Sequence, residues 1–184
     1  MKSDPVVDLI LATERNMHLA AVVSDAWLST RGRLVSEFLA KLRERLESKL
    51  KGWRCTVWRQ FFVDPYCDVY LLKPSWDKQY YITLQCSDHG EKMELGVQRD
   101  ETHVGKRPFC PEILAAVKEH YPSARSRIWW EAVTRMQSPA ADWRKPEVLW
   151  RMHKDDKFLD DVAEQLHEVA QATEAILDRL VQKQ

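Results

Sequence analysis

The chain has 184 residues with 28 Lys and Arg against 28 Asp and Glu, so its formal net charge at pH 7 is zero. A neutral chain lacks the field of one sign that steers proteins towards nucleic acids or membrane surfaces. With 45% hydrophobic and 30% charged residues and no apolar run of about 18 residues, the sequence predicts one soluble domain without a transmembrane helix. It shows no export signal, so we expect a cytoplasmic protein whose four cysteines are free thiols.

The first 52 residues carry two helical patterns. Ser3-Asp4-Pro5 is typical of a helix start, because an Asp side chain caps the first turn and Pro is favoured at the first helical position. Thr30-Arg31-Gly32 interrupts the first pattern, and a second helix is expected from Leu34 to Leu50, ending near Gly52. The seam of the first helix recurs in steps of three and four residues and consists of Val6, Ile10, Thr13, Met17, Ala20, Ser24 and Trp27.

Between residues 53 and 135 the hydrophobic period changes to two, which is typical of strands. Short connections rich in turn residues indicate that consecutive strands pair as antiparallel hairpins in a meander. Residues 127–134 alternate in the same way, as a fifth strand or as an extended cover on the sheet. The four strands of the meander are predicted over residues 53–62, 67–72, 80–86 and 93–97.

The C-terminal part is predicted to be helical. A short helix follows Pro108 and reaches about His120, a second begins at Lys145-Pro146-Glu147, and Asp155-Asp156 cap a long last helix. Its seam needs apolar cover, and the N-terminal helix is the expected partner, in the same molecule or in a second copy. The seam consists of Leu159, Val162, Leu166, Val169, Thr173, Ile176 and Leu180.

Together these patterns predict one α+β domain over residues 1–184. It comprises a helical N-terminal part over 1–52, a four- to five-stranded antiparallel sheet within 53–135, and a helical C-terminal part over 146–184. We expect the long N- and C-terminal helices to pack together, as a hairpin or as the seam of a homodimer.

Sequence motifs for catalysis are missing. There is no GxGxxG, P-loop, GxSxG or HExxH pattern, so we expect no catalytic residue, no cofactor and no metal. A weaker alternative is a nucleophilic Cys110, because the start of a helix lowers a thiol pKa. Another is a zinc site, although the spacing of its four candidate ligands is unfamiliar. These ligands would be Cys86, His89, His103 and Cys110.

Arginines and tryptophans gather between residues 125 and 151, and this Trp/Arg cluster is the main candidate for a binding surface. Guanidinium groups neutralise phosphates and indole rings stack on unpaired bases, while the same residue types dominate protein interfaces. Some of these rings are alternatively part of the core, which we favour for Trp130 and Trp150. The candidate contact residues are Arg125, Arg127, Trp129, Arg135, Trp143, Arg144 and Arg151.

Parts of this region resemble a known family. Ser126-Arg127-Ile128-Trp129-Trp130, Trp143, Pro146-Glu147-Val148-Leu149, the helix over 158–180 and the earlier Glu94-Leu95-Gly96-Val97 are similar to the C-terminal accessory region of bacterial and phage PD-(D/E)XK nuclease-like proteins. The resemblance implies a bacterial or phage origin, in defence or counter-defence, and an accessory fold without the nuclease. Asp68 could supply the first metal-binding carboxylate of such a nuclease, but Thr83, Gln85 and Ser87 cannot supply the remaining groups.

The sequence therefore favours a non-enzymatic cytoplasmic module that binds and regulates a protein partner. Nucleic-acid binding through the Trp/Arg cluster is the alternative, and a degenerate nuclease or a Cys110-dependent enzyme is a weaker one. We expect no membrane partner, and the helical seams allow a homodimer.

Overall fold

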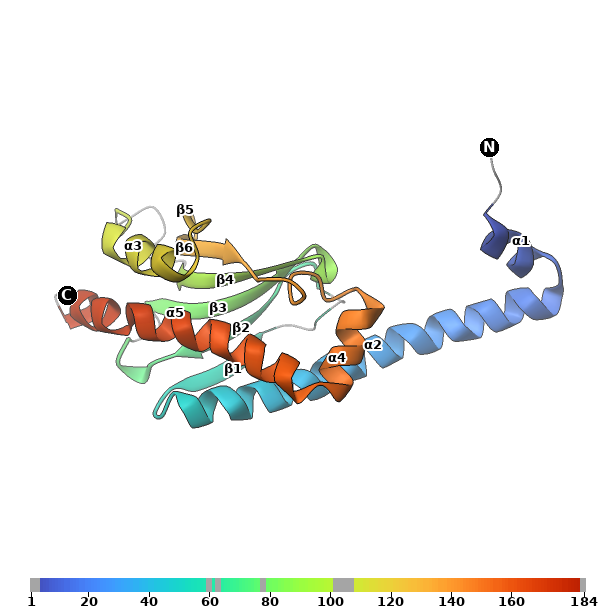
Figure 1. Cartoon of the computed structure of the whole chain (residues 1–184), viewed down its shortest axis with the longest axis horizontal. Coiled ribbons are helices and arrows are strands. Elements are labelled where there is room, and N and C mark those ends of the chain that lie inside the picture. Colours follow the sequence, from blue (N-terminus) through green and yellow to red (C-terminus); the bar gives the residue numbers. More distant parts are fainter. Residues whose placement is uncertain (1–3, 59–60, 62–63, 77–78, 101–107, 183–184) are drawn as a thin grey trace.

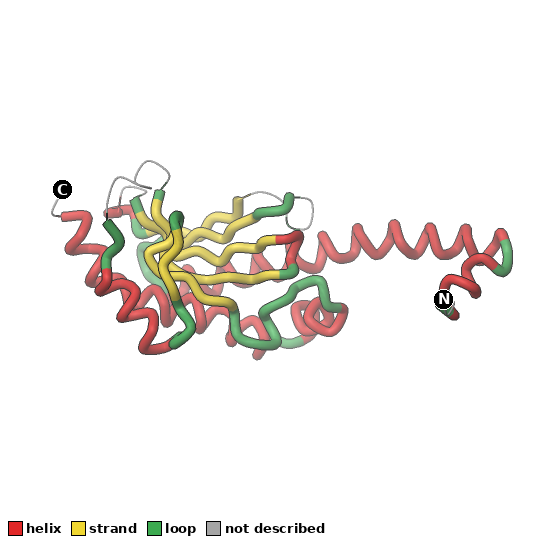
Figure 2. The backbone as a smooth tube through the Cα atoms, turned by 90° about the horizontal axis from the view of Figure 1, so that it is seen from above, coloured by secondary structure: helices red, strands yellow, loops and turns green. Residues whose placement is uncertain are grey.

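The sheet and most of the helices form two layers. The computed structural model of the chain describes residues 4–58, 61, 64–76, 79–100 and 108–182. Figure 1 shows the long helices running along the sheet, and Figure 2 shows the strands as one layer with the helices on one side of it. The architecture is α+β, as the sequence predicts, but the described sheet has six strands instead of four or five. Within the described residues, no helix is long and apolar enough to span a bilayer.

All neighbouring strands are antiparallel, in the order β1-β2-β3-β4-β6-β5. The first four form the predicted meander, and the segment expected to hold a fifth strand is a hairpin of two. The strands span Arg54–Trp58 (β1), Cys67–Leu72 (β2), Tyr80–Ser87 (β3), Lys92–Arg99 (β4), Arg125–Arg127 (β5) and Trp130–Arg135 (β6). The α-helices span Pro5–Leu11 (α1), Glu14–Lys49 (α2), Pro111–His120 (α3), Pro146–Lys154 (α4) and Asp156–Gln182 (α5).

The helix α2 runs without interruption through the segment where the sequence predicts a break. The break lies instead at Ala12 and Thr13, where the Thr13 hydroxyl caps α2 by accepting a hydrogen bond from the Asn16 N–H at 3.0 Å. Gly32 keeps an ordinary helical backbone, and a glycine inside a helix costs only about 1 kcal/mol relative to alanine. The prediction of two helices over residues 6–50, divided near Gly32, was therefore wrong.

The core lies between the sheet and the helices α2, α3, α4 and α5. The seam of α5 is buried from Leu159 to Thr173, and α5 contacts α2, α3, β3 and β4. The contact with α2 uses its second half, in which Val35 and Leu42 are buried. The expected pairing of the long helices is therefore present, but the seam over residues 6–27 takes no part in it.

None of the described helices covers the opposite face of the sheet. Along β2, β3 and β4 alternate residues point to the helices, and Val69, Leu84 and Leu95 are fully buried there. The residues between them, such as Tyr70 and Gln85, point to the other side, where Figure 2 shows no helix over the strands. We call this side the open face.

Gly96 in β4 allows a close approach of β6. A Cβ atom at Gly96 would lie 2.0 Å from the backbone oxygen of Ala132. We expect Gly96→Ala to lower the free energy of unfolding by about 2 kcal/mol or more, because the added methyl group forces the two strands apart. Chemical denaturation measures the effect.

Gly32→Ala is the matched control. Nothing lies within 4 Å of a Cβ atom at Gly32. Removing a glycine from a helix interior should therefore raise the free energy of unfolding by about 0.5–1 kcal/mol. A Gly96→Ala variant as stable as the wild type would contradict the close approach of β4 and β6.

Candidate binding face on the open side of the sheet

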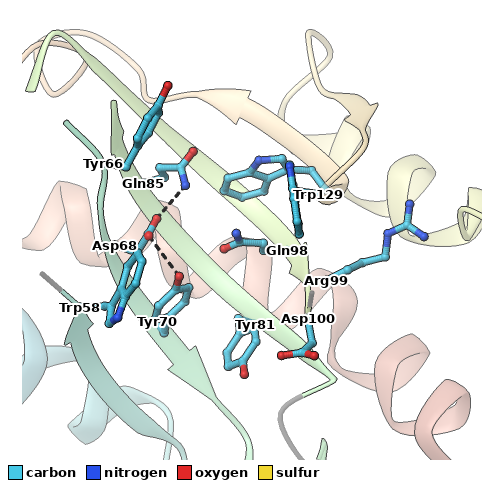
Figure 3. Close-up of a pocket in the computed structure, with 11 residues that line it drawn as sticks. Trp58, Tyr66, Asp68, Tyr70, Tyr81, Gln85, Gln98, Arg99, Asp100 and Trp129 are labelled. Atoms are coloured by element: carbon cyan, nitrogen blue, oxygen red, sulfur yellow. Dashed lines mark hydrogen bonds between the residues drawn. The ribbon is translucent and has the colours of Figure 1, made fainter. Parts of the chain in front are cut away.

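Six aromatic side chains gather around a cavity of about 610 Å³ on the open face (Figure 3). They come from four strands and from two connections, and β-strand geometry places the strand residues on this side because their neighbours in the chain face the core. We call this set the aromatic face. It consists of Trp58, Tyr66, Tyr70, Tyr81, Trp129 and Trp130.

Asp68 lies at the bottom of this cavity and is only 2% exposed. Its carboxylate accepts hydrogen bonds from the Gln85 amide at 2.9 Å and from the Tyr70 hydroxyl at 3.1 Å, as Figure 3 shows. Gln85 is directly opposite Asp68 in the β2–β3 ladder. A buried carboxylate requires such donors, so Asp68 holds the side chains of Gln85 and Tyr70 in fixed positions.

Polar groups without a formal charge line the centre of the aromatic face. The Tyr70 and Tyr81 rings are 5.0 Å apart between centroids, and Thr83 donates to the Gln98 side chain at 3.1 Å. Burial, together with the nearby Asp100 carboxylate, raises the pKa of Tyr81. The phenol therefore stays protonated at neutral pH and can both donate and accept a hydrogen bond.

A second cavity of about 820 Å³ adjoins the first and is lined by more charged side chains. Arg127 and Glu94 pair across it at 2.9 Å, and Lys92 pairs with Asp88 at 2.6 Å. Tyr66, Gln85, Trp129 and Trp130 line both cavities. The two cavities therefore form one continuous groove, aromatic at one end and charged at the other.

A buried ion pair holds the β5–β6 hairpin against β4. The Arg99 guanidinium lies 3.5 Å from the Glu131 carboxylate, with both side chains almost completely buried. The Arg99 backbone N–H donates to the Trp129 carbonyl at 2.9 Å. In Figure 3 the Arg99 side chain points away from the other labelled residues, while its backbone fixes that of Trp129.

The structure divides the predicted Trp/Arg cluster. Four of the seven candidate residues, Arg125, Arg127, Trp129 and Arg135, line the second cavity together. Glu91 lies between Arg135, which donates to its carbonyl at 3.3 Å, and Arg144, which pairs with its carboxylate at 2.9 Å.

The other two candidate residues do not join this group. Trp143 is completely buried, with its ring 5.4 Å from that of Phe61, so it is a core residue. Arg151 is exposed on α4, in the helical layer. Trp130 is 4% exposed, as favoured, whereas Trp150 is 64% exposed, so the expectation that Trp150 is a core residue was wrong.

Sequence reasoning misses most of the aromatic face. From the sequence alone, Trp58, Tyr66, Tyr70 and Tyr81 are only strand or turn residues. A usable signal is present, because Tyr70 alternates with the apolar Val69 and Leu71, as expected for a ring on the far side of the same strand. Alternation alone does not show that the far side of the sheet is left uncovered.

The alternative chemistries find little geometric support among the described residues. Cys86 is buried on the core side opposite Cys67, and His103 lies outside the described residues. The described chain contains no group of three or more His, Cys, Asp or Glu side chains that could hold a metal ion. Cys110 does precede α3, as predicted, and its backbone N–H donates to Glu131 at 2.7 Å.

The chain was compared with protein-family models, with curated proteins and with solved structures, and nothing in any of the three sets matches it. The resemblance to the accessory region of PD-(D/E)XK nuclease-like proteins therefore stays a prediction.

The ion pair between Arg99 and Glu131 leads to a stability prediction. Burial raises the pKa of Glu131, while the Cys110 N–H and Arg99 act in the opposite direction. We expect Glu131→Gln to lower the free energy of unfolding by about 3 kcal/mol, because it removes the carboxylate that neutralises a buried guanidinium. Chemical denaturation followed by tryptophan fluorescence measures this change.

Glu112→Gln is the control, since Glu112 forms an ion pair with Arg179 at 2.7 Å in which both side chains are more than half exposed. A surface pair of this kind contributes less than about 1 kcal/mol. Equal effects of the two substitutions would show that the buried pair does not hold the hairpin.

Proposed function

We propose that this chain is a non-enzymatic protein-binding module and that the aromatic face is its contact surface. The observation that carries the proposal is the exposure of Trp58, Tyr66 and Trp129, at 44%, 51% and 41%, around hydrogen-bonded amides on an uncovered sheet. Trp and Tyr are the residues that contribute most to the energy of protein interfaces, because a large ring loses little conformational entropy when it becomes buried.

The charges along the groove favour a protein over a nucleic acid. A nucleic-acid site presents cations that exchange counterions for phosphates. Here Arg127 pairs with Glu94, Lys92 with Asp88, and Arg144 with Glu91 and Asp142. A phosphate backbone would meet these carboxylates as well as the cations, whereas a protein with side chains of both signs can complement them.

Binding of single-stranded nucleic acid is the second candidate function. Three exposed rings on an antiparallel sheet offer flat surfaces on which unpaired bases can stack. Exposed Arg125 lies at the charged end of the same groove. The two candidates share one surface, so the same variants distinguish them.

Peptides selected from a random displayed library on the immobilised chain provide the probe. We expect Trp58→Ala and Trp129→Ala each to weaken the binding of selected peptides about tenfold, as removal of a ring from the centre of an interface does. Isothermal titration calorimetry measures the affinity. The control is Trp150→Ala, because Trp150 is even more exposed, at 64%, but lies on α4, and it should leave the affinity unchanged.

Three results would contradict the proposal. One is a library that yields no peptide dependent on Trp58 or Trp129. Another is binding of single strands that needs both tryptophans and weakens steeply with salt, which would support the second candidate. The third is metal-dependent cleavage of DNA or RNA that Asp68→Ala abolishes.

A further inference from the structure

The N-terminal part of the chain projects beyond the rest of the molecule. Figures 1 and 2 show α1 and the first half of α2 extending past the sheet and the other helices. We call residues 4–31 the arm. Ten of its large apolar side chains are between 38% and 67% exposed: Val6, Val7, Leu9, Leu11, Met17, Leu19, Val22, Val23, Trp27 and Leu28.

The arm also carries few charges for an exposed helix. Between Arg15 and Arg31 the only acidic or basic residue besides His18 is Asp25. A helix that is apolar on most of its sides is normally packed against other helices, because packing supplies most of a helix's stability. Among the described residues, α1 covers the arm at Asn16 and Ala20, which are half-buried, whereas residues 21–30 are all exposed.

One face of the arm continues the face of α2 that packs in the core. Val35, Phe38 and Leu42 are buried and follow each other at steps of three and four residues. The same heptad positions, extended towards the N-terminus, are Arg31, Leu28, Ser24, Ala21, Met17 and Glu14. From Glu14 to Leu28 the arm therefore presents to solvent the face that the second half of the same helix buries, and Arg31, which is half-buried with its Nε covered, marks where the cover begins.

We propose that this face binds the same face of a second copy, with the two helices antiparallel and related by a two-fold axis. In such a pair, positions whose numbers add to 45 lie opposite each other. Glu14 of one copy then faces Arg31 of the other, and Met17 faces Leu28. The small residues Ala21 and Ser24 meet near the axis. Charge and size are thus both self-complementary, as a two-fold interface requires.

The same arrangement accounts for an apolar groove at the base of the arm. Trp27, Leu34, Leu149 and Trp150 line this groove between α2 and α4. Asn16, Ala20, Trp27 and Leu34 share one side of α2, because they are spaced by four and seven residues. Figures 1 and 2 both place α1 and α4 on this side, with a gap between them.

The second copy's α1 fits this gap. In the second copy, α1 packs on Asn16 and Ala20 of its own α2. In the antiparallel pair these two positions lie at the same height along the helix axis as residues 29 and 25 of the first copy, which flank Trp27. The exposed apolar side chains of α1 would therefore enter the groove. One two-fold axis thus covers both the heptad face and the groove.

Charge reversal on the full chain tests the pairing. Sedimentation equilibrium should give the wild type a mass of twice 21.7 kDa at micromolar concentration. Glu14→Arg and Arg31→Glu should each raise the dimer dissociation constant by about tenfold or more, because each places like charges together twice per dimer. An equimolar mixture of the two variants should regain the dimer, because each of the two contacts between position 14 of one chain and position 31 of the other then joins opposite charges.

Glu44→Arg is the matched control, since it reverses the same charge at an exposed position of α2 outside the arm, and it should leave the mass at the dimer value. Recovery on mixing excludes misfolding of the variants as the reason for dissociation. A wild type that is monomeric at these concentrations, or a mixture that does not recover, would overturn the proposal.

Cross-linking tests the direction of the helices. In the antiparallel pair, position 17 of one copy meets position 28 of the other, so a mixture of Met17→Cys and Leu28→Cys chains should form a disulfide on oxidation. The two copies of position 17 would lie 11 residues apart along the axis, about 16 Å at 1.5 Å per residue, so Met17→Cys chains alone should not cross-link. Efficient linkage between two Met17→Cys chains would indicate parallel helices and contradict the pairing.

The dimer does not depend on the function proposed for the aromatic face. The arm substitutions leave Trp58 and Trp129 unchanged, so peptide affinity per chain should stay the same in monomeric variants. Loss of the peptide interaction with an intact dimer would count against the proposed function alone.

Discussion

The fold depends on the contact between the apolar face of α5 and one face of the sheet. Val162, Leu166 and Leu177 are completely buried, and α5 contacts the central strands β3 and β4. Removal of apolar surface from water, at roughly 25 cal/mol per Å², is the main favourable contribution to such a contact between layers. The second half of α2 packs on the same side. The sheet is therefore covered on one face, and the other face is left to polar and aromatic side chains.

This one-sided cover explains the character of the aromatic face. No described helix buries the rings on the open face, so most of them stay accessible, and Trp130 is the exception at 4% exposed. The Asp68 carboxylate can be buried on this face because Gln85 and Tyr70 donate hydrogen bonds to it. The Arg99–Glu131 pair holds the neighbouring hairpin, so most of the groove is built on strands, with Tyr66 and Trp129 in the connections between them. A rigid surface loses little entropy on binding, which favours recognition of a partner.

The helix α2 links the two surfaces of the molecule. It is continuous from Glu14 to Lys49, so the arm leaves the core in a fixed direction. Its two halves share one heptad pattern but differ in cover, because α5 and the sheet reach only the second half. In the proposed dimer each particle would carry two aromatic faces, and two linked sites bind a repeated partner more tightly than one site does.

Local patterns in the sequence determined much of the secondary structure. The heptads of α5, the alternation along β2, β3 and β4, and the Asp4 and Asp155 caps were all predicted, and both carboxylates accept the expected backbone N–H. Such patterns depend only on residues close together in the chain, which set the hydrophobic period and the local hydrogen bonds.

Tertiary structure alone decided which of the similar residues are buried. Trp143 lies in the core, Trp129 borders the groove and Trp150 is exposed, although all three belong to one Trp-rich segment. The continuity of α2 through Gly32 and the pairing of β6 with β4 were likewise not evident. The hydrophobic period shows which side chains share one face of a helix or strand. Whether that face is covered depends on contacts between residues far apart in the chain.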